Sequence, residues 1–221
     1  MKDMEKELMI SREQGPAALF GSYRDYMEMI HLYNGAIKQL KIRLEVLNDE
    51  FTVRYARSPI HHVETRIKSA TSVVKKLKNK KVEVSIPNAM EYVNDIAGVR
   101  VVCSYIDDVY RVAEMLKRQG DIEIIKEKDY IKEPNYNGYR SLHLDVRVPV
   151  YLSASKEMIA AEIQLRTVAM DFWASLEHDL HYKNDKDIPE DICRQMCDSA
   201  NEIARIDRKM QEIFEEIQKL D

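Results

Sequence analysis

Two stretches of the chain, Ser141–Val148 and Ile159–Arg166, alternate apolar and polar residues. A period of two residues is typical of strands that bury one face, because successive side chains point to opposite sides. Aliphatic residues occupy one side of both stretches. The polar residues on the other side are Ser141, His143, Asp145, Arg147, Glu162, Gln164 and Arg166. If both strands pack their aliphatic sides on one core, these polar side chains share a sheet face that is either exposed to water or a site.

Further segments of strand and helix character surround these two stretches. Ile96–Ser104 is rich in β-branched residues and, with Ile122–Lys126, is expected to add strands to the sheet. Apolar spacings of three and four predict helices over 22–51, from Ser58 to about Leu77, from Asp107 to Gly120, over Val168–Tyr182 and after Pro189. Turns are expected around Pro87 and over Lys128–Tyr139. The chain is therefore expected to have an α/β fold of the α+β type, with a sheet flanked by helices.

Composition and glycine spacing exclude several classes of protein. The 221 residues are 45% hydrophobic, which is enough for a core, and no apolar run approaches the roughly 18 residues of a membrane span. The net charge of -4 argues against a general nucleic-acid coat, and three cysteines do not form a disulfide framework. The six glycines form neither GxGxxG nor a P-loop, so a bound nucleotide would be held by side chains. Without a secretory signal at the N-terminus, we expect a soluble cytoplasmic protein.

A basic segment lies in the expected second helix. Thr65–Val82 contains seven lysines and arginines and no acidic residue. At about 100° per residue, Lys68, Ser72 and Lys75 share one helical face. Such a face can bind phosphate oxygens through ammonium charges and a hydroxyl donor. The alternative is an ordinary lysine face exposed to water.

Carboxylates suggest a metal site on the sheet. Asp95 precedes the strand that begins at Ile96, and Glu162 lies on the polar side of a second strand. Two carboxylates can hold one Mg²⁺ and leave positions for water and phosphate. The alternative is an exposed antiparallel face with incidental charges.

The turn that contains Asn137-Gly138 combines tyrosines with an arginine. Tyr136, Tyr139 and Arg140 lie within four residues of one another around it. A tyrosine ring can stack on a base, and arginine can pair with phosphate or stack. The alternative is a plain connection whose tyrosines cover nearby apolar surface.

Taken together, four stretches resemble those of a known family. The chain resembles the RelA/SpoT-type alarmone synthetases, specifically the stand-alone small alarmone synthetases, and the RelP branch more than the RelQ branch. The stretches, which follow the family's order and spacing, are 58–69 (SPIHHVETRIKS), 95–103 (DIAGVRVVC), 137–143 (NGYRSLH) and 162–178 (EIQLRTVAMDFWASLEH). The resemblance covers roughly residues 22–215.

The resemblance implies a reaction and a fold. Members transfer the β,γ-pyrophosphate of ATP to the 3′-hydroxyl of GDP or GTP, giving AMP and ppGpp or pppGpp, the alarmones of the stringent response. The implied fold is a nucleotidyltransferase-like mixed sheet of about five strands flanked by helices. Long relatives carry a histidine-rich hydrolase domain, for which 221 residues leave no room, so we expect synthesis without hydrolysis.

Site residues carry over by position as further implications of the resemblance. The residues assigned to ATP are Arg66, Lys68, Ser72, Arg100 and Lys128. Those assigned to the acceptor GDP or GTP are Tyr139, Arg140, His143, Gln164 and Arg166. Mg²⁺ is assigned to Asp95 and Glu162, and catalysis to these two residues together with Lys68.

Within this assignment, individual roles differ. Arg66 and Arg100 are expected to sandwich the adenine, and Tyr139 to stack on guanine. Arg140 and His143 are expected to contact the acceptor's phosphates. Glu162 is expected near the acceptor's 3′-hydroxyl, where it could take the proton, although a metal-bound carboxylate has little basicity to spare.

Two positions depart from some relatives, which have arginine and asparagine where this chain has Lys128 and Asp171. The change at 128 argues against bidentate phosphate binding there, and no role is carried over to 171.

A catalytically silent nucleotide-binding or RNA-binding regulator with the same fold is the alternative function. An intact metal pair, phosphate lysine and loop tyrosine favour the enzyme. A third reading is a different nucleotidyltransferase that releases pyrophosphate from ATP.

The C-terminal helix has an apolar seam. Ile203, Ile206, Met210, Ile213, Ile217 and Leu220 follow a three-four repeat, which is typical of a helix that packs on a partner. Packing on its own domain is the alternative, whereas the family tendency is a homotetramer assembled through terminal helices. We therefore expect an N-terminal tail over 1–21, a synthetase domain over 22–190 and an oligomerisation helix over 191–221.

Overall fold

The computed structural model describes residues 20–183 and 189–220, so most of the expected N-terminal tail lies outside it. Its strands are β1 (Ile60–Ile67), β2 (Ala97–Cys103), β3 (Glu123–Asp129), β4 (Leu142–Tyr151) and β5 (Lys156–Thr167). Its helices are α2 (Tyr23–Tyr55), α3 (Ala70–Asn79), α4 (Ile86–Tyr92), α5 (Ile106–Lys117), α6 (Val168–Lys183) and α7 (Glu190–Gln218). No described helix is long and apolar enough to span a membrane.

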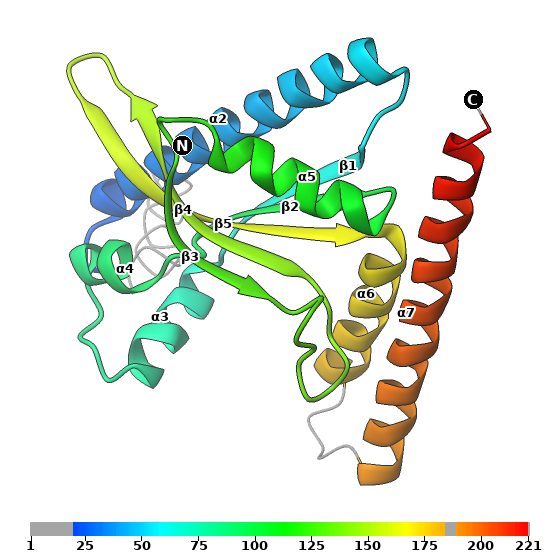
Figure 1. The fold of residues 1–221 in the computed structure, drawn as a ribbon. Coiled ribbons are helices and arrows are strands. Elements are labelled where there is room, and N and C mark those ends of the chain that lie inside the picture. The colour runs from blue at the N-terminus through cyan, green and yellow to red at the C-terminus, as the bar shows by residue number, and fades with distance from the viewer. Residues whose placement is uncertain (1–19, 184–188, 221) are drawn as a thin grey trace, which may run out of the picture.

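The five strands form one mixed sheet in the order β1-β2-β5-β4-β3. β2 and β5 run parallel, and the other neighbouring pairs are antiparallel. Helices α3 and α4 lie at one end of the sheet, and α6 and α7 pack side by side at the opposite end (Figure 1). The expected mixed sheet with flanking helices is confirmed.

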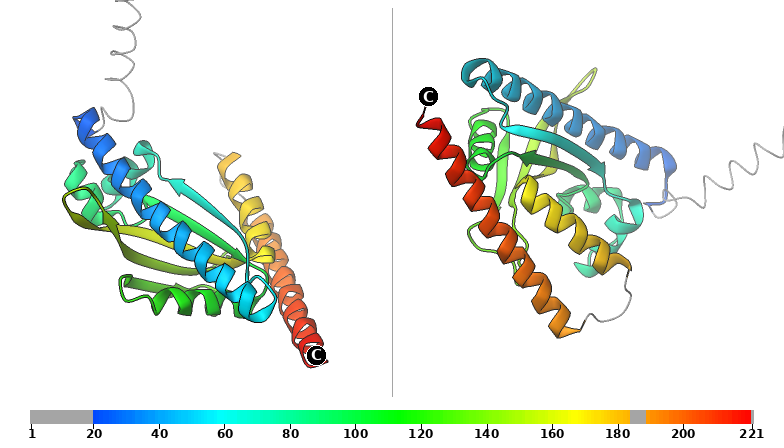
Figure 2. Two further views of the ribbon diagram at one scale, coloured as in Figure 1. Left: turned by 90° about the horizontal axis from the view of Figure 1, so that it is seen from above. Right: turned by 90° about the vertical axis from the view of Figure 1, so that its right-hand side faces the viewer.

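One face of the sheet forms the core. The aliphatic residues of β4 and β5 that the alternation singled out are buried there, and α2 and α5 pack over them. Figure 2 shows α2 extending along the sheet, with α7 beside α6. The opposite face keeps the polar residues of the strands and is the one that carries the candidate site.

The helix expected from Ser58 to Leu77 is wrong in its first half. Residues up to Ile67 form β1, an edge strand, and the helix begins only at Ala70. Val63 and Ile67 are four residues apart, a spacing that places two residues on the same face of a strand as well as of a helix. The apolar pattern therefore did not distinguish the two structures. Ser69 then caps α3 by accepting a hydrogen bond from the backbone N–H of Ser72.

Two smaller expectations are also corrected. The region around Pro87 is the short helix α4, because Ser85 caps it and proline fits a first turn, where its missing N–H leaves no bond unmade. Asp107 lies inside the first turn of α5 instead of capping it. The side chain of Gln211 on α7 accepts the hydrogen bond from the N–H of Asp107. A cap supplied from 104 residues away leaves no local sequence signal.

Candidate active site

Strand register places two polar rows across the sheet. The first row, from β1 to β3, is Arg66, Gly98, Glu162, Asp145 and Lys126. The second row, in the same strand order, is Glu64, Arg100, Gln164, His143 and Lys128. Residues two apart on a strand share a face, so both rows lie on the same side of the sheet. The register thus brings together six of the predicted site residues, namely Arg66, Arg100, Lys128, His143, Glu162 and Gln164.

Two hollows open on this face, and Glu162 lines both. The first hollow has a volume of about 330 Å³ and is lined by Glu64, Thr65, Arg66, Gly98, Val99, Arg100, Glu162 and Gln164. The second hollow, of about 610 Å³, is lined by Lys76, Lys80, Tyr92, Asn94, Asp95, Lys126, Lys128, His143, Asp145 and Glu162. Glu162 therefore lies where ligands of the two hollows would meet.

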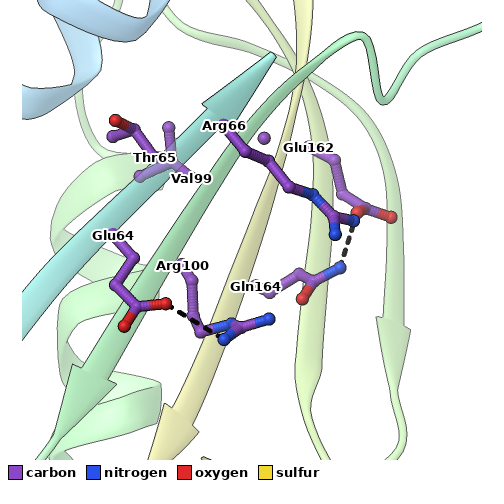
Figure 3. Close-up of a pocket in the computed structure, with 8 residues that line it drawn as sticks. Glu64, Thr65, Arg66, Val99, Arg100, Glu162 and Gln164 are labelled. Carbon is purple, nitrogen blue, oxygen red and sulfur yellow. Dashed lines mark hydrogen bonds and ion pairs between the residues drawn. The ribbon is translucent and has the colours of Figure 1, made fainter. Parts of the chain in front are cut away.

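Two arginines line the first hollow. Arg66 reaches over β2 toward Glu162 (Figure 3), across Gly98, where an added Cβ would lie 3.2 Å from the Arg66 Cγ. Arg100 Nη1 donates to Glu64 Oε2 at 3.0 Å, and its buried Nε has no hydrogen-bond partner. Glycine at 98 thus leaves the space that lets Arg66 lie beside Arg100 over the same hollow.

Asp95 lies between two lysines. Its Oδ2 accepts from Lys68 Nζ at 2.8 Å and forms an ion pair with Lys76 Nζ at 2.7 Å. Burial alone would raise the pKa of Asp95, but the hydrogen bonds from Lys68 and Lys76 outweigh it and lower the pKa below its ordinary value. The carboxyl is therefore ionised at neutral pH.

The other oxygen of Asp95 fits a metal ion. Asp95 Oδ1 is buried without a hydrogen-bond partner, and Glu162 lines the same hollow. Among the described residues no group of three or more acidic, histidine or cysteine side chains is arranged to hold a metal. Mg²⁺ commonly takes only one or two protein carboxylates and completes its shell with water and phosphate oxygens. Asp95 and Glu162 therefore fit a magnesium ion that arrives with a phosphate ligand.

Glu162 is held from two sides. Gln164 Nε2 donates to Glu162 Oε2 at 2.7 Å, and His143 Nδ1 lies 3.5 Å from Glu162 Oε1. Burial alone would raise the pKa of Glu162, but the hydrogen bonds from His143 and Gln164, together with the charge of His143, lower the pKa below its ordinary value. Glu162 is thus an ionised carboxylate that is suited to hold a cation. It is also only a weak proton acceptor.

Tyr139 joins this network from the loop before β4. Its hydroxyl lies 2.8 Å from His143 Nε2 and accepts from Arg166 Nη2 at 2.6 Å. The guanidinium of Arg166 also lies over the Tyr139 ring, 5.1 Å from its centroid, and donates to Gln164 Oε1 at 2.8 Å. The Tyr139 hydroxyl thus links Arg166 to His143, which in turn lies beside Glu162.

Two predicted residues stand apart from the others. Arg140 donates to Gly138 O at 2.9 Å and to Asn201 Oδ1 on α7 at 2.9 Å, so the structure does not bring its guanidinium into either hollow. Ser72 lies exposed on α3, one turn before Lys76, with its hydroxyl 2.8 Å from that of Ser69. Because β1 ends at Ile67, Lys68 lies in the connection to α3 and not on a helical face.

Sequence reasoning did not assign several residues of this region. Lys76 binds Asp95 and lies four residues after Ser72, a helical spacing that signals a shared face. Asp145 lies directly opposite Glu162 on β4, on the polar side that the alternation identified. Asp171, from the first turn of α6, reaches Arg100 and Arg166 through one oxygen. Nothing in the sequence alone signals the contacts of Asp171.

Known proteins resemble this chain over most of its length. The family described as "Region found in RelA / SpoT proteins" matches residues 65–187. The GTP pyrophosphokinase YwaC of Bacillus subtilis is 40% identical over 193 residues, which cover 87% of this chain and 92% of that protein. The GTP pyrophosphokinase YjbM of the same organism is 36% identical over 188 residues, 85% of this chain and 87% of that protein.

Solved structures agree with this match. Small alarmone synthetase 2 from Bacillus subtilis has a TM-score of 0.79 at 40% identity, over 87% of this chain and 99% of that one. Small alarmone synthetase 1 from Bacillus subtilis, bound to its product pppGpp, has a TM-score of 0.80 at 33% identity, over 88% of this chain and 99% of that one. These names do not distinguish the RelP from the RelQ branch, so that expectation stays a prediction. The chain belongs to the RelA/SpoT family.

Proposed function

We propose that this protein is a (p)ppGpp synthetase that transfers the β,γ-pyrophosphate of ATP to the 3′-hydroxyl of GDP or GTP and releases AMP. The observation that carries the proposal is the position of Glu162 between an arginine-lined hollow and a hollow that combines lysines with Asp95. Relatives that cover most of the chain are named GTP pyrophosphokinases, and one similar structure is bound to pppGpp and another to AMPCPP.

ATP would occupy the first hollow and extend toward the lysines. The planar guanidinium groups of Arg66 and Arg100 would stack on the adenine. Lys68, Ser72 and Lys128 would contact the phosphates, and Lys76 joins them because it already binds Asp95 beside Lys68. These cations offset the negative charge that accumulates during transfer, which together with positioning supplies most of the catalysis in phosphoryl transfer.

Asp95 and Glu162 would hold Mg²⁺. The unpartnered Oδ1 of Asp95 supports this role, since a buried carboxylate oxygen without a partner is costly. Bound there, the ion would supply Lewis-acid stabilisation of phosphate oxygens. Lys68 and Lys76, which share the other oxygen of Asp95, keep that carboxylate ionised and oriented.

The acceptor would bind on the Tyr139 side, with Tyr139 stacking on guanine and His143, Gln164 and Arg166 around it. The 3′-oxygen attacks the β-phosphorus, the bond from the β-phosphorus to the α,β-bridging oxygen breaks, and AMP leaves with that oxygen. The proton of the hydroxyl passes to Glu162 or to water. The lowered pKa of Glu162 makes it a weak base, so its main contribution is to orient the hydroxyl.

Product analysis tests this function. The protein is incubated with ATP, Mg²⁺ and GDP, GTP or GMP in turn, and nucleotides are separated by charge. We expect AMP together with ppGpp or pppGpp. Glu162→Gln should lower turnover by orders of magnitude, whereas Glu157→Gln, on an exposed part of the same strand, should not. ADP with phosphate, or nucleotide binding without any product, would replace the proposal with another transferase or with the silent regulator.

Three accompanying expectations stay predictions. Hydrolysis is tested with labelled alarmone and Mn²⁺, where rapid pyrophosphate release would contradict synthesis alone. A homotetramer is supported by the exposure of most of the α7 seam, namely Ile206, Met210, Ile213, Ile217 and Leu220, whereas Ile203 packs inward. Light scattering that gives the mass of one chain at micromolar concentration would contradict it. Cytoplasmic location is tested by cell fractionation.

A further inference from the structure

One carboxylate oxygen contacts two arginines on different sides of the site. Asp171 Oδ1 lies 3.4 Å from Arg100 Nη1 and 3.3 Å from Arg166 Nη1. Asp171 is in the first turn of α6, which follows β5 without a loop. Thr167 fixes that turn, because its hydroxyl accepts from the N–H of Met170 at 3.1 Å. The backbone at the start of α6 is thus fixed relative to the strand that carries Glu162, and the Asp171 carboxylate itself contacts the two arginines.

On one side, Asp171 completes the pairing of Arg100. Glu64 Oε2 accepts from the same Nη1 at 3.0 Å, so two carboxylates lie at one edge of the guanidinium. Carboxylates bind guanidinium in its plane, which leaves the flat faces open for stacking. They also offset its charge, which reduces its attraction for phosphate. Arg100 in this state suits an aromatic base better than a phosphate group.

On the other side, Asp171 holds Arg166 against the tyrosine. The Arg166 side chain is only 5% exposed, and among the described residues Asp171 is the carboxylate that pairs with it. The other terminal nitrogen of Arg166, Nη2, donates to the Tyr139 hydroxyl at 2.6 Å, and the guanidinium carbon lies over the Tyr139 ring, 5.1 Å from its centroid. A change in the position of Arg166 therefore changes the position of Tyr139.

We propose that Asp171 is a positioning residue that couples the two nucleotide sites, by orienting Arg100 for the base of ATP and Arg166 with Tyr139 for the acceptor. The inference rests on the proposed function for the identity of the two ligands. Ordering either arginine orders the shared carboxylate, so the first nucleotide bound lowers the ordering cost for the second. ATP and GDP should accordingly strengthen each other's binding by the same factor.

The test measures this coupling directly. Dissociation constants for AMPCPP are measured by calorimetry without and with saturating GDP, and those for GDP without and with AMPCPP, whose methylene bridge blocks transfer. We expect the wild-type protein to show coupling of about fivefold or more. Asp171→Asn keeps the shape of the side chain but removes its charge. It should weaken the binding of both nucleotides and bring the coupling factor close to one. Asp171→Glu, which keeps the negative charge, should retain part of the coupling.

Glu64→Gln is the matched control, because Glu64 contacts Arg100 but not Arg166. It should weaken AMPCPP, leave GDP binding unchanged and keep the coupling factor. Any of three results would overturn the inference: an unchanged coupling factor in Asp171→Asn, an equal loss of coupling in Asp171→Asn and Glu64→Gln, or a coupling factor of one in the wild-type protein. AMP production by the wild-type protein is assayed separately. If both nucleotides bind with coupling but no AMP forms, the proposed function fails while the inference stands.

Discussion

Gly98 is the residue whose replacement should separate activity from stability. It lies on β2 in the first polar row, between Arg66 on β1 and Glu162 on β5. A Cβ added there would meet the Arg66 Cγ at 3.2 Å, which is closer than ordinary van der Waals contact, and the Arg66 Nε at 3.4 Å. The contact is with a flexible side chain, so Gly98→Ala displaces Arg66 and leaves the sheet intact.

The structure gives the size of both effects. Relief of the contact needs a shift of a few tenths of an ångström, and because a 1 Å misplacement costs about 10²-fold, we expect kcat/KM for ATP to fall about three- to fivefold. Gly98→Val, which crowds Arg66 further, should cost at least about tenfold on the same scale. Replacement of a strand glycine reduces the entropy of the unfolded chain, so stability should rise by about 0.5 to 1 kcal/mol.

Initial rates of AMP formation over a range of ATP concentrations, with thermal unfolding of the same samples, provide the assay. Gly120→Ala is the control, since an added Cβ there has nothing within 4 Å. Gly98→Ala should lose activity without losing stability, and Gly120→Ala should keep its activity. Wild-type kinetics in both Gly98 variants, or unfolding at a lower temperature in Gly98→Ala, would refute the assignment of that space to Arg66.

Three further predictions concern buried groups. Arg57→Ala removes the hydrogen-bonded partner of the Asp108 side chain, which is 0% exposed. The variant should be less stable by about 3 kcal/mol in denaturant titration, because it leaves a buried charge unpaired. Adding Asp108→Asn to the same chain should reduce this loss. Burial raises the pKa of Asp207, so ionisation of this carboxyl costs stability as the pH rises through that pKa. The Asp207→Asn variant should therefore gain more stability relative to wild type at pH 7 than at pH 4. An equal gain at both pH values would contradict this. Burial also raises the pKa of the Cys103 thiol, which should react with a maleimide only on unfolding, as mass spectrometry of the labelled peptide would show.

Alternation was the most informative part of the sequence, because a period of two fixes which side chains share a face. It placed β4, β5 and their polar sides correctly, and with them Glu162, Gln164 and His143. It did not identify β1, where Val63 and Ile67 fit a helix and a strand equally well. A spacing of four residues distinguishes a helix from a strand only when further apolar residues of the same element lie at positions three or seven from the first.

Relations between strands were beyond the sequence for a different reason. The parallel pairing of β2 with β5 sets Gly98 beside Glu162, and neither strand encodes that register by itself. The residue pattern suggested Asp95 and Glu162 as a metal pair and the family resemblance implied the same pair, and the structure places both on one hollow. Contacts such as those of Asp171 depend on where a helix starts relative to the sheet, which no residue pattern specifies.

The glycines show how this site differs from a phosphate-binding loop. Loops of that kind need several glycines so that backbone N–H groups can approach the phosphates. At the proposed site the donors would be side chains of the sheet, of α3 and of the connection between β1 and α3, so the close approach is needed at one strand position, Gly98, where an arginine crosses its neighbour. Donors on strands are more precisely held than donors on loops. A chain with six scattered glycines can therefore hold two nucleotides if its sheet register, and not its backbone flexibility, sets the geometry.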